Sequence, residues 1–382
     1  MALDAGLAGR LDAVIDGALG ARIVGCVVLV AHDGETVYAR AAGEADREAG
    51  RPVRRDTIFR YASLTKPIVS AAALGLMEEG VIHLEDPVTR ILPDFRPKLP
   101  DGSEPVITIR HLMTHTSGLT YDFMEPPESA YHGQGISNGF DVAGMSMAEN
   151  LRRIVAWPLN FPPGAAWNYS VATDVLGAAL AAATGETLPE LVRRKVTGPL
   201  GMNDTDFSVV DLDRLAAPYA DAAPAPVRMG ASHVVPFAPS PLMFAPDRML
   251  DPTSFPSGGA GMAGNADDYL TFLEAIRTQG GPILAPHSAR LMLENAIGDI
   301  PVTATGPGYG FSLGGAILRD PKGAGTPQPA GTWSWGGVYG SSWFVDPVNR
   351  LTVVAITNTA IEGMVGAFTI GVRDAVYGKD AA

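Results

Sequence analysis

A serine and a lysine one helical turn apart are the strongest chemical signal in the sequence. Ser63 and Lys66 lie in Phe59-Arg-Tyr-Ala-Ser-Leu-Thr-Lys-Pro67, a segment typical of a helix start. Residues three apart on a helix share a face, so both side chains point the same way. A serine hydroxyl becomes nucleophilic when a base takes its proton, and a lysine can be that base once its pKa falls well below about 10.4. The pair predicts attack of the serine on an acyl group, and the backbone N–H groups at the helix N-terminus would stabilise the oxyanion that forms. The four residues Ser63-Leu-Thr-Lys66 are also compatible with a structural role, in which the serine caps a helix and the lysine lies on the surface.

Two further segments gain meaning beside Ser63. Tyr169 follows a Pro-Pro-Gly turn and precedes a predicted helix, and a phenolate can relay a proton if nearby cations lower its pKa. The segment from Trp333 to Trp343 interleaves aromatic residues with glycines, which lets a substrate approach a strand's backbone N–H groups. Alone, each segment also fits a structural role, as a packing tyrosine or as a buried aromatic strand with glycine bulges.

A second serine motif is rejected on chain order. Gly310-Phe-Ser-Leu-Gly314 matches the nucleophile elbow of α/β-hydrolases, in which the catalytic histidine follows the serine. All seven histidines of this chain precede Ser312. We therefore predict that Ser312 is a strand residue.

Metal and cofactor sites are not predicted. His111 and His115 have i, i+4 spacing but lack the intervening Glu of a metalloprotease, so they are interpreted as helix-end and packing histidines. The single cysteine, Cys26, lies in an apolar run and is expected to be buried. The glycine cluster 258–261 lacks the surroundings of a nucleotide site and is interpreted as a close approach between a strand and a helix.

The two ends of the chain are predicted to position these residues by forming one antiparallel sheet flanked by helices. Apolar residues at helical spacing indicate an N-terminal helix, and an Asp-Gly turn joins predicted strands over 23–32 and 36–42. The C-terminal part adds strands over 309–318, 332–345 and 351–357 and a closing helix over 363–377. The apolar face of the first helix is formed by Leu3, Leu7, Leu11, Val14 and Ile15.

The middle of the chain is predicted to be mostly helical. Helices are expected over 63–79 and 170–184, from a capping box at Ser146, and from Thr187, which is followed by Pro and Glu in the first turn. Residues 218–256 contain nine prolines, so they are predicted to lack regular structure and to line a functional site or form a mobile linker. The expected division is a sheet subdomain of residues 1–75 and 255–382 and a helical subdomain of residues 76–254, together one catalytic unit.

Composition excludes several classes of function. The 382 residues are 46% hydrophobic and 18% charged, which suits a large folded core rather than a disordered chain. The net charge is −13 and no basic run is present, so nucleic-acid and anionic-membrane binding are not expected. No apolar stretch reaches a membrane span, and no signal-peptide pattern is found, so a cytoplasmic protein is expected. Composition leaves open whether it is a monomer or a homo-oligomer.

Four ordered segments resemble the serine β-lactamase/penicillin-binding-protein superfamily, in its class C-like branch. They are Ser63-Leu-Thr-Lys66, Thr108–Leu119, Pro163–Ser170 and Trp335-Gly-Gly337. The resemblance implies a β-lactamase/transpeptidase-like α/β (α+β) fold without metal or cofactor. It implies that Ser63 is acylated, that Lys66 is its neighbouring base, and that Tyr169 takes part in proton transfer. It also implies an oxyanion hole formed by the N–H groups of Ser63 and Val338, and it does not decide whether Lys66 or Tyr169 deprotonates the serine.

Departures from that pattern carry the functional information. Val171 stands where a class C β-lactamase has an asparagine, and Trp335-Gly336-Gly337 replaces Lys-Thr-Gly. The groups that address the amide and the carboxylate of a β-lactam are therefore missing, which favours a neutral ester and resembles the family VIII carboxylesterases. The residues expected to contact substrate are Trp335, Gly336, Gly337, Tyr121, Val171 and Tyr339.

The predicted function is a serine carboxylesterase that hydrolyses small to medium neutral esters through an acyl-enzyme on Ser63. Its expected partner is a small-molecule ester. Alternatives on the same fold are a β-lactamase, a D-amino-acid peptidase or an acyltransferase. An alternative of another class is a non-catalytic binding protein.

Overall fold

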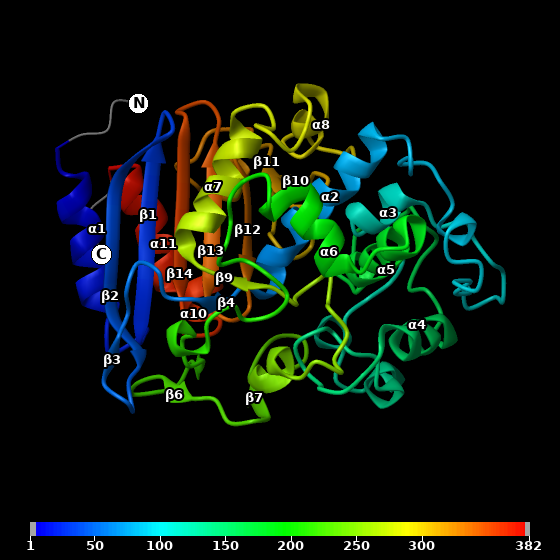
Figure 1. The fold of residues 1–382 in the computed structure, drawn as a ribbon, viewed down its shortest axis with the longest axis horizontal. Coiled ribbons are helices and arrows are strands. Elements are labelled where there is room, and N and C mark those ends of the chain that lie inside the picture. Colours follow the sequence, from blue (N-terminus) through cyan, green and yellow to red (C-terminus); the bar gives the residue numbers. More distant parts are fainter. Residues whose placement is uncertain (1–4, 379–382) are drawn as a thin grey trace.

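The computed structural model describes residues 5–378 and contains the predicted antiparallel sheet. Eight strands lie in the order β10-β11-β12-β13-β14-β1-β2-β3. The N-terminal strand β1 pairs with the C-terminal strand β14, in the register Val28 opposite Ala355. In Figure 1 the blue and orange strands therefore lie side by side. The strand bounds are β1 Gly25–His32, β2 Glu35–Asp46, β3 Arg51–Pro52, β10 Tyr309–Phe311, β11 Ala316–Leu318, β12 Trp333–Gly337, β13 Ser341–Asp346 and β14 Leu351–Thr357.

Two predicted strands are in fact hairpins. The stretch 309–318 divides into β10 and β11, and the stretch 332–345 divides into β12 and β13. Gly314 has φ +130° and Gly340 has φ +110°, values that favour glycine and reverse the chain at each place. The first hairpin, between β1 and β2, is confirmed, with Asp33 and its glycine neighbour at positive φ.

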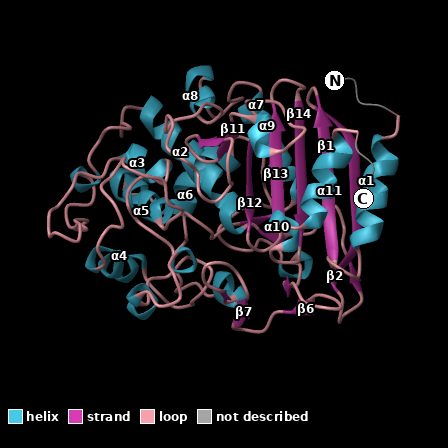
Figure 2. Ribbon diagram, turned by 180° about the vertical axis from the view of Figure 1, so that it is seen from behind, coloured by secondary structure: helices cyan, strands magenta, loops and turns pink. Residues whose placement is uncertain are grey.

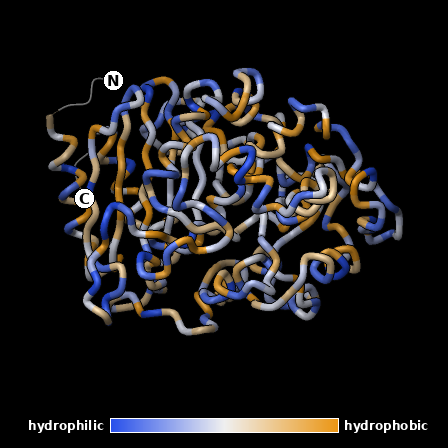
Figure 3. Tube along the Cα trace, viewed as in Figure 1, coloured by the Kyte–Doolittle hydropathy of each residue, from blue (hydrophilic) through white to orange (hydrophobic). Residues whose placement is uncertain are grey.

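Helices cover both faces of the sheet. On one face, α1 (Leu7–Ala18) packs beside α11 (Ala367–Val376), as Figure 2 shows from behind. On the other face lie α7 (Ala266–Arg277), α8 (Pro286–Leu291) and the central helix α2 (Thr65–Glu78). Because both faces are covered, β1 and β14 are almost wholly apolar and buried, which Figure 3 shows as hydrophobic stretches.

The predicted terminal helices differ in detail from the structure. Leu7, Leu11, Val14 and Ile15 are buried as expected, whereas Leu3 lies outside the described residues. The closing helix is interrupted, because α10 (Glu362–Val365) ends at the extended residue Gly366 before α11 begins.

The middle of the chain is helical, as predicted. It contributes α3 (Ile109–Met113), α4 (Met147–Ala156), α5 (Ala172–Thr184) and α6 (Leu188–Val192), and α9 (Pro321–Ala324) follows later. The capping box predicted at Ser146 is incomplete, because Glu149 pairs with arginines instead of bonding back to Ser146. The helix start predicted at Thr187 is confirmed, and there a complete capping box is present. The predicted division into two subdomains stays a prediction.

The proline-rich segment 218–256 is not wholly irregular, which corrects the prediction. It forms the hairpins β5–β6 and β7–β8 and a 3₁₀-helix over Pro246–Leu250. The strand bounds are β5 Tyr219–Ala220, β6 Val227–Arg228, β7 His233–Val235 and β8 Leu242–Phe244. Upstream, β4 (Phe59–Arg60) pairs with β9 (Ala263–Gly264).

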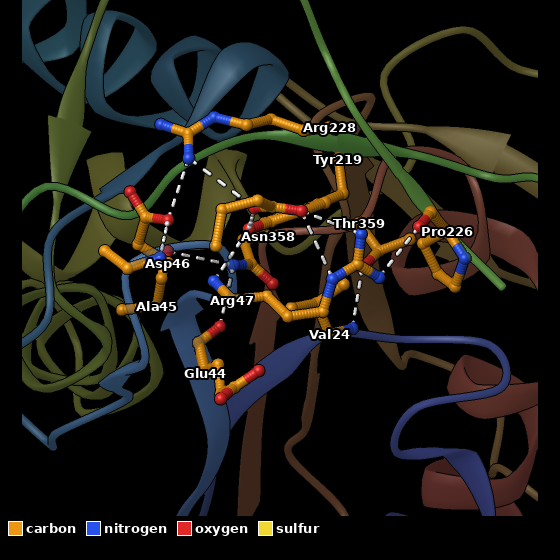
Figure 4. Close-up of polar contacts among 12 residues, drawn as sticks. Val24, Glu44, Ala45, Asp46, Arg47, Tyr219, Pro226, Arg228, Asn358 and Thr359 are labelled. Atoms are coloured by element: carbon orange, nitrogen blue, oxygen red, sulfur yellow. Dashed lines mark hydrogen bonds and ion pairs between the residues drawn. The ribbon is translucent and has the colours of Figure 1, made fainter.

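A polar network ties the start of this segment to the sheet (Figure 4). The Tyr219 N–H donates to the Asn358 carbonyl over 2.8 Å, and the Tyr219 hydroxyl accepts from the Arg47 N–H over 2.8 Å. Arg228 donates to the Asp46 carboxylate over 2.8 Å. The proline-rich segment is thus anchored to the sheet at this end, rather than being a mobile linker.

No single helix within residues 5–378 is long and apolar enough to cross a membrane. One pair of consecutive helices, Ala172–Thr184 and Leu188–Thr197, reaches the required length and composition together, but its two members are bent by 85°.

Candidate active site

The segment carrying Ser63 is held between the sheet and the helical region. It runs from β4 through a 3₁₀-helix (Ala62–Leu64) into α2. Tyr61 donates its N–H to the Met262 carbonyl over 2.9 Å, and the Thr65 hydroxyl accepts from the Met262 N–H over 3.1 Å. Ala62 has φ +45°, a left-handed conformation that is strained for a residue with a Cβ and typical of functional sites. The surroundings therefore fix Ser63 in one position.

The structure brings together the three residues predicted for catalysis. The Ser63 Oγ accepts hydrogen bonds from the Tyr169 hydroxyl over 2.6 Å and from Lys66 Nζ over 3.1 Å. Lys66 Nζ also lies 4.6 Å from the centre of the Tyr169 ring. Ser63, Lys66 and Tyr169 are 5%, 2% and 8% exposed. The nucleophile candidate is thus in contact with both candidate bases in a place largely shielded from water.

Lys66 has a second partner that the sequence does not reveal. Its Nζ donates to the Gly259 carbonyl over 2.8 Å. The loop around Gly259 is held by Asp174 in the first turn of α5, whose Oδ1 accepts from the Ser257 hydroxyl over 2.5 Å and from the Gly259 N–H over 3.2 Å. The glycines allow this approach, since a Cβ on Gly258 would lie 2.5 Å from the Thr173 carbonyl oxygen. The expected close approach to a helix is present, but it comes from a turn rather than a strand, and it also aligns the lysine.

Burial controls the charge of the groups around this centre. Burial holds the pKa of His115 well below its usual range, and the positive charge of Lys66 lowers it further, so the imidazole is neutral. Burial raises the pKa of the Tyr121 phenol well above its ordinary value. Burial also raises the pKa of Asp174, while the Ser257 hydrogen bond and Lys66 oppose that shift. Among the described residues no carboxylate forms a salt bridge with Lys66, and its Nζ is directed at Ser63 and Gly259.

Aromatic side chains fix the orientation of Tyr169. Its ring stacks on Trp167 with centroids 6.2 Å apart and meets His115, Tyr121 and Trp335 at 4.9 to 5.2 Å. Trp335 Nε1 donates to the Tyr169 hydroxyl over 3.2 Å. The hydroxyl can therefore receive one hydrogen bond from tryptophan while it donates another to Ser63, which suits a proton relay.

The edge of β12 lies against the Ser63 segment. A Cβ on Gly337 would lie 2.3 Å from the Tyr61 carbonyl oxygen, so only glycine permits this separation. Val338 follows directly, and both Val338 and Ser63 line the same cavity. This arrangement places Val338 beside the nucleophile, as an oxyanion hole made of these two residues requires.

A cavity of about 440 Å³ opens from Ser63 and Tyr169. Phe237 lines it from the proline-rich segment, one of the two roles predicted for that segment, Phe123 and Met124 line it from another loop, and Trp335 and Gly336 line it from β12. Arg373 is the one charged residue among the described residues that line it, and its guanidinium pairs with Asp374 over 2.7 Å. The cavity is therefore mainly apolar.

Four predicted substrate contacts lie behind the cavity wall. Val171 is 1% exposed, and Tyr121 packs between Tyr169 and Phe123 with 2% exposure. Gly337 presses against Tyr61, and Tyr339 faces Arg60, whose guanidinium carbon lies 5.9 Å from the tyrosine ring centre. Of the six residues predicted to contact substrate, Trp335 and Gly336 line the cavity and these four do not.

The rejected motifs are also placed by the structure. Ser312 lies in the turn between β10 and β11 rather than in a strand, and its hydroxyl donates to the Gly315 carbonyl over 3.1 Å. Ser312 is outside a strand because the chain reverses at Gly314 and Gly315, shortly after it. His111 closes the capping box of α3 and His115 packs in the aromatic cluster, as expected. Within residues 5–378 no group of three or more His, Cys, Asp or Glu side chains could hold a metal ion.

Comparison with known proteins agrees with this geometry. A family model described as Beta-lactamase matches residues 11–373. The chain is 51% identical over 379 residues to Esterase EstB of Burkholderia gladioli, covering 98% of this chain and 96% of that protein. It is similar to the solved structure of EstCE1, a hydrolase with promiscuous acyltransferase activity, with a TM-score of 0.93 and 44% identity over 98% and 99% of the two chains. Simvastatin synthase (LovD) from Aspergillus terreus, at 24% identity over 96% and 97% of the two chains, shares the fold with a TM-score of 0.78.

Proposed function

The chain belongs to the beta-lactamase family, and from this premise we propose that it is a serine carboxylesterase acting on neutral esters. The observation that carries the proposal is the Ser63 hydroxyl held by both Tyr169 and Lys66 on the wall of an apolar cavity. The relative that is 51% identical over nearly the whole of both chains is named an esterase, which supports the same chemistry here.

In the proposed mechanism, Ser63 Oγ attacks the ester carbonyl carbon, and its proton passes either to Lys66 as a neutral amine or to Tyr169 as a phenolate. The C–O double bond opens, and the resulting oxyanion is stabilised by the N–H groups of Ser63 and Val338. The tetrahedral intermediate collapses with cleavage of the ester C–O bond, and the Tyr169–Lys66 pair returns the proton to the leaving alcohol. Water then attacks the acyl-enzyme by the same steps and releases the acid.

The lining of the site supports a neutral substrate. Trp335 occupies the edge of β12 where an anion-reading site would need a cation, and it contacts Tyr169 instead. Lys66 is already engaged with Ser63 and Gly259. A free carboxylate next to the reacting carbonyl would therefore lose its hydration without gaining a partner, which is unfavourable.

Acyl transfer to an alcohol is a second candidate function. A structure 44% identical to this chain is titled a hydrolase with promiscuous acyltransferase activity. A cavity of about 440 Å³ can hold an acceptor beside the acyl group. Addition of a small alcohol to the assay tests this, because transfer gives a new ester while hydrolysis gives the free acid. The expected cytoplasmic location, lack of nucleic-acid partners and assembly state stay predictions.

The proposal is tested by removing the nucleophile. We expect Ser63→Ala to reduce the kcat for p-nitrophenyl butyrate by several orders of magnitude. Ser312→Ala is the matched control and should keep wild-type activity, because that hydroxyl only closes a hairpin turn. More than a few per cent residual activity in folded Ser63→Ala would defeat the assignment. Failure of a fluorophosphonate to label wild-type Ser63 would favour a non-catalytic binding protein.

A further inference from the structure

The catalytic cavity does not end at the β12 edge. Strand β11 pairs with β12 at Trp333 and Ser334 alone, so the edge from Trp335 to Gly337 is free of a neighbouring strand. Residues on the far side of this edge, including Ser334, Ser342 and Phe344, line the same cavity as Ser63. The cavity therefore passes around the edge, from the catalytic side of the sheet to the side covered by α11.

The floor of this extension consists of two rows of side chains across three strands. Strand register places Gly336, Ser342 and Ala355 in one row. It places Ser334, Phe344 and Val353 in the next row, two residues along β12. Side chains two residues apart on a strand share a face, so both rows look toward α11. All six residues line the cavity.

The roof comes from the C-terminal helices. Thr369, Ile370 and Arg373 of α11 line the cavity above the floor. Met364 of α10 packs directly against Gly336, since a Cβ there would approach its Cγ to 2.7 Å, so it closes the groove over this glycine. We call this part of the cavity the α11 groove, lined by Ser334, Ser342, Phe344, Val353, Thr369 and Ile370.

The dimensions of the α11 groove suit a linear alkyl chain of a substrate. Crossing from β12 over β13 to β14 spans two strand spacings, roughly 10 Å in total. An extended chain advances roughly 1.2 Å per bond, so roughly eight carbon atoms reach across the floor. The walls are apolar apart from two serines, a threonine and Arg373, whose guanidinium pairs with Asp374, and Ile370 is left 46% exposed at the rim. A free apolar surface continuous with a reaction centre is expected to bind part of the substrate.

We propose that the α11 groove binds the acyl chain of the substrate, so that the enzyme prefers linear acyl esters of roughly six to ten carbons. The inference rests on the proposed esterase function. The leaving alcohol must stay beside the Tyr169 hydroxyl to receive its proton, on the catalytic side of the β12 edge where Trp335 Nε1 also donates to that hydroxyl. The arm of the ester that passes around the β12 edge into the groove is therefore the acyl arm.

Two series of esters show whether the acyl arm or the alcohol arm of the substrate occupies the α11 groove. In p-nitrophenyl esters with acyl chains from two to twelve carbons, kcat/KM should rise by up to roughly fourfold per methylene until the groove is filled. Acetate esters of linear alcohols over the same range, followed by titration of released acid, should show a much flatter dependence. A steep rise with the alcohol series and a flat acyl series would overturn the assignment. A folded wild type that hydrolyses neither series would refute the esterase function itself.

Substitutions on α11 test the groove directly. Thr369→Trp fills the roof, and we expect the ratio of kcat/KM for octanoate to that for acetate to fall at least tenfold. Ala367→Trp on the exposed side of the same helix is the matched control and should keep this ratio within twofold. Ser342→Leu on the floor provides a second variant should Thr369→Trp fail to fold. An unchanged ratio in either folded groove variant would overturn the inference.

Discussion

A single methyl group at Gly337 tests how the oxyanion site is built. The Cβ of Gly337→Ala would lie 2.3 Å from the Tyr61 carbonyl oxygen and 3.1 Å from Leu64 Cδ1. The first of these neighbours is backbone, so it cannot swing aside as a flexible side chain can. Ordinary contact begins near 3.4 Å, which means that β12 and the Ser63 segment must separate by about 1 Å.

The expected result is a large loss of rate with a smaller loss of stability. Val338 follows Gly337, so its N–H moves away from the oxyanion position by a similar distance. Removal of one oxyanion donor lowers kcat by about 10² to 10³, and a misplacement of about 1 Å has an effect of about 10². Overpacking of this kind destabilises by about 1 to 3 kcal/mol, which leaves a folded protein to assay.

The assay compares kcat and KM for p-nitrophenyl butyrate well below the melting temperature of each variant. We expect kcat of Gly337→Ala to fall about 100-fold or more while KM changes little. Gly17→Ala on α1 is the control, because a Cβ there meets nothing within 4 Å. A folded Gly337→Ala whose kcat is within threefold of wild type would refute the placement of Val338 at the oxyanion.

Two further predictions concern buried carboxyl groups. Asp174→Ala should lower kcat by about ten- to a hundredfold with little change in KM, because the loop whose Gly259 carbonyl accepts from Lys66 loses its anchor. Asp174→Asn keeps an acceptor oxygen for Ser257 and Gly259, so it should retain most of the wild-type rate. Equal losses of kcat in both variants would contradict this role of Asp174. Burial raises the pKa of Asp141 from 3.8 to about 6, so folding favours its protonated form, and that contribution to stability is complete below about 3.8 and is lost as pH rises through 6. The melting temperature of Asp141→Asn relative to wild type should therefore rise between pH 4 and pH 7 in a thermal scan, and a pH-independent difference would contradict it.

Local sequence signals predicted much of the fold because their causes are local. The Asp-Gly turn between β1 and β2 needs only two residues able to take positive φ, and the helix start at Thr187 is marked by Pro and Glu within the next three residues. Ser63 and Lys66 could be identified because one helical turn separates them. That both ends of the chain share one sheet followed from their strand-like runs, whereas the pairing of β1 with β14 was not predicted.

The missed features depend on tertiary contacts or on turns. The Gly259 carbonyl lies 193 residues from Lys66 in sequence, and no local pattern indicates that the two meet. Trp335 and Tyr339 would share a face on an unbroken strand, but the turn over 338–340 carries Tyr339 to Arg60, away from the cavity. Val171 is 1% exposed because it opens α5 against the core, a burial that Tyr-Ser-Val alone does not specify.

Detection of the acyl-enzyme tests the central claim most directly. Rapid acid quenching of a reaction with p-nitrophenyl octanoate, followed by digestion and mass spectrometry, should find one octanoyl group on the peptide that contains Ser63. The same peptide from Ser63→Ala should carry none. Ester hydrolysis with no adduct on Ser63, or with the acyl group on another residue, would contradict the account.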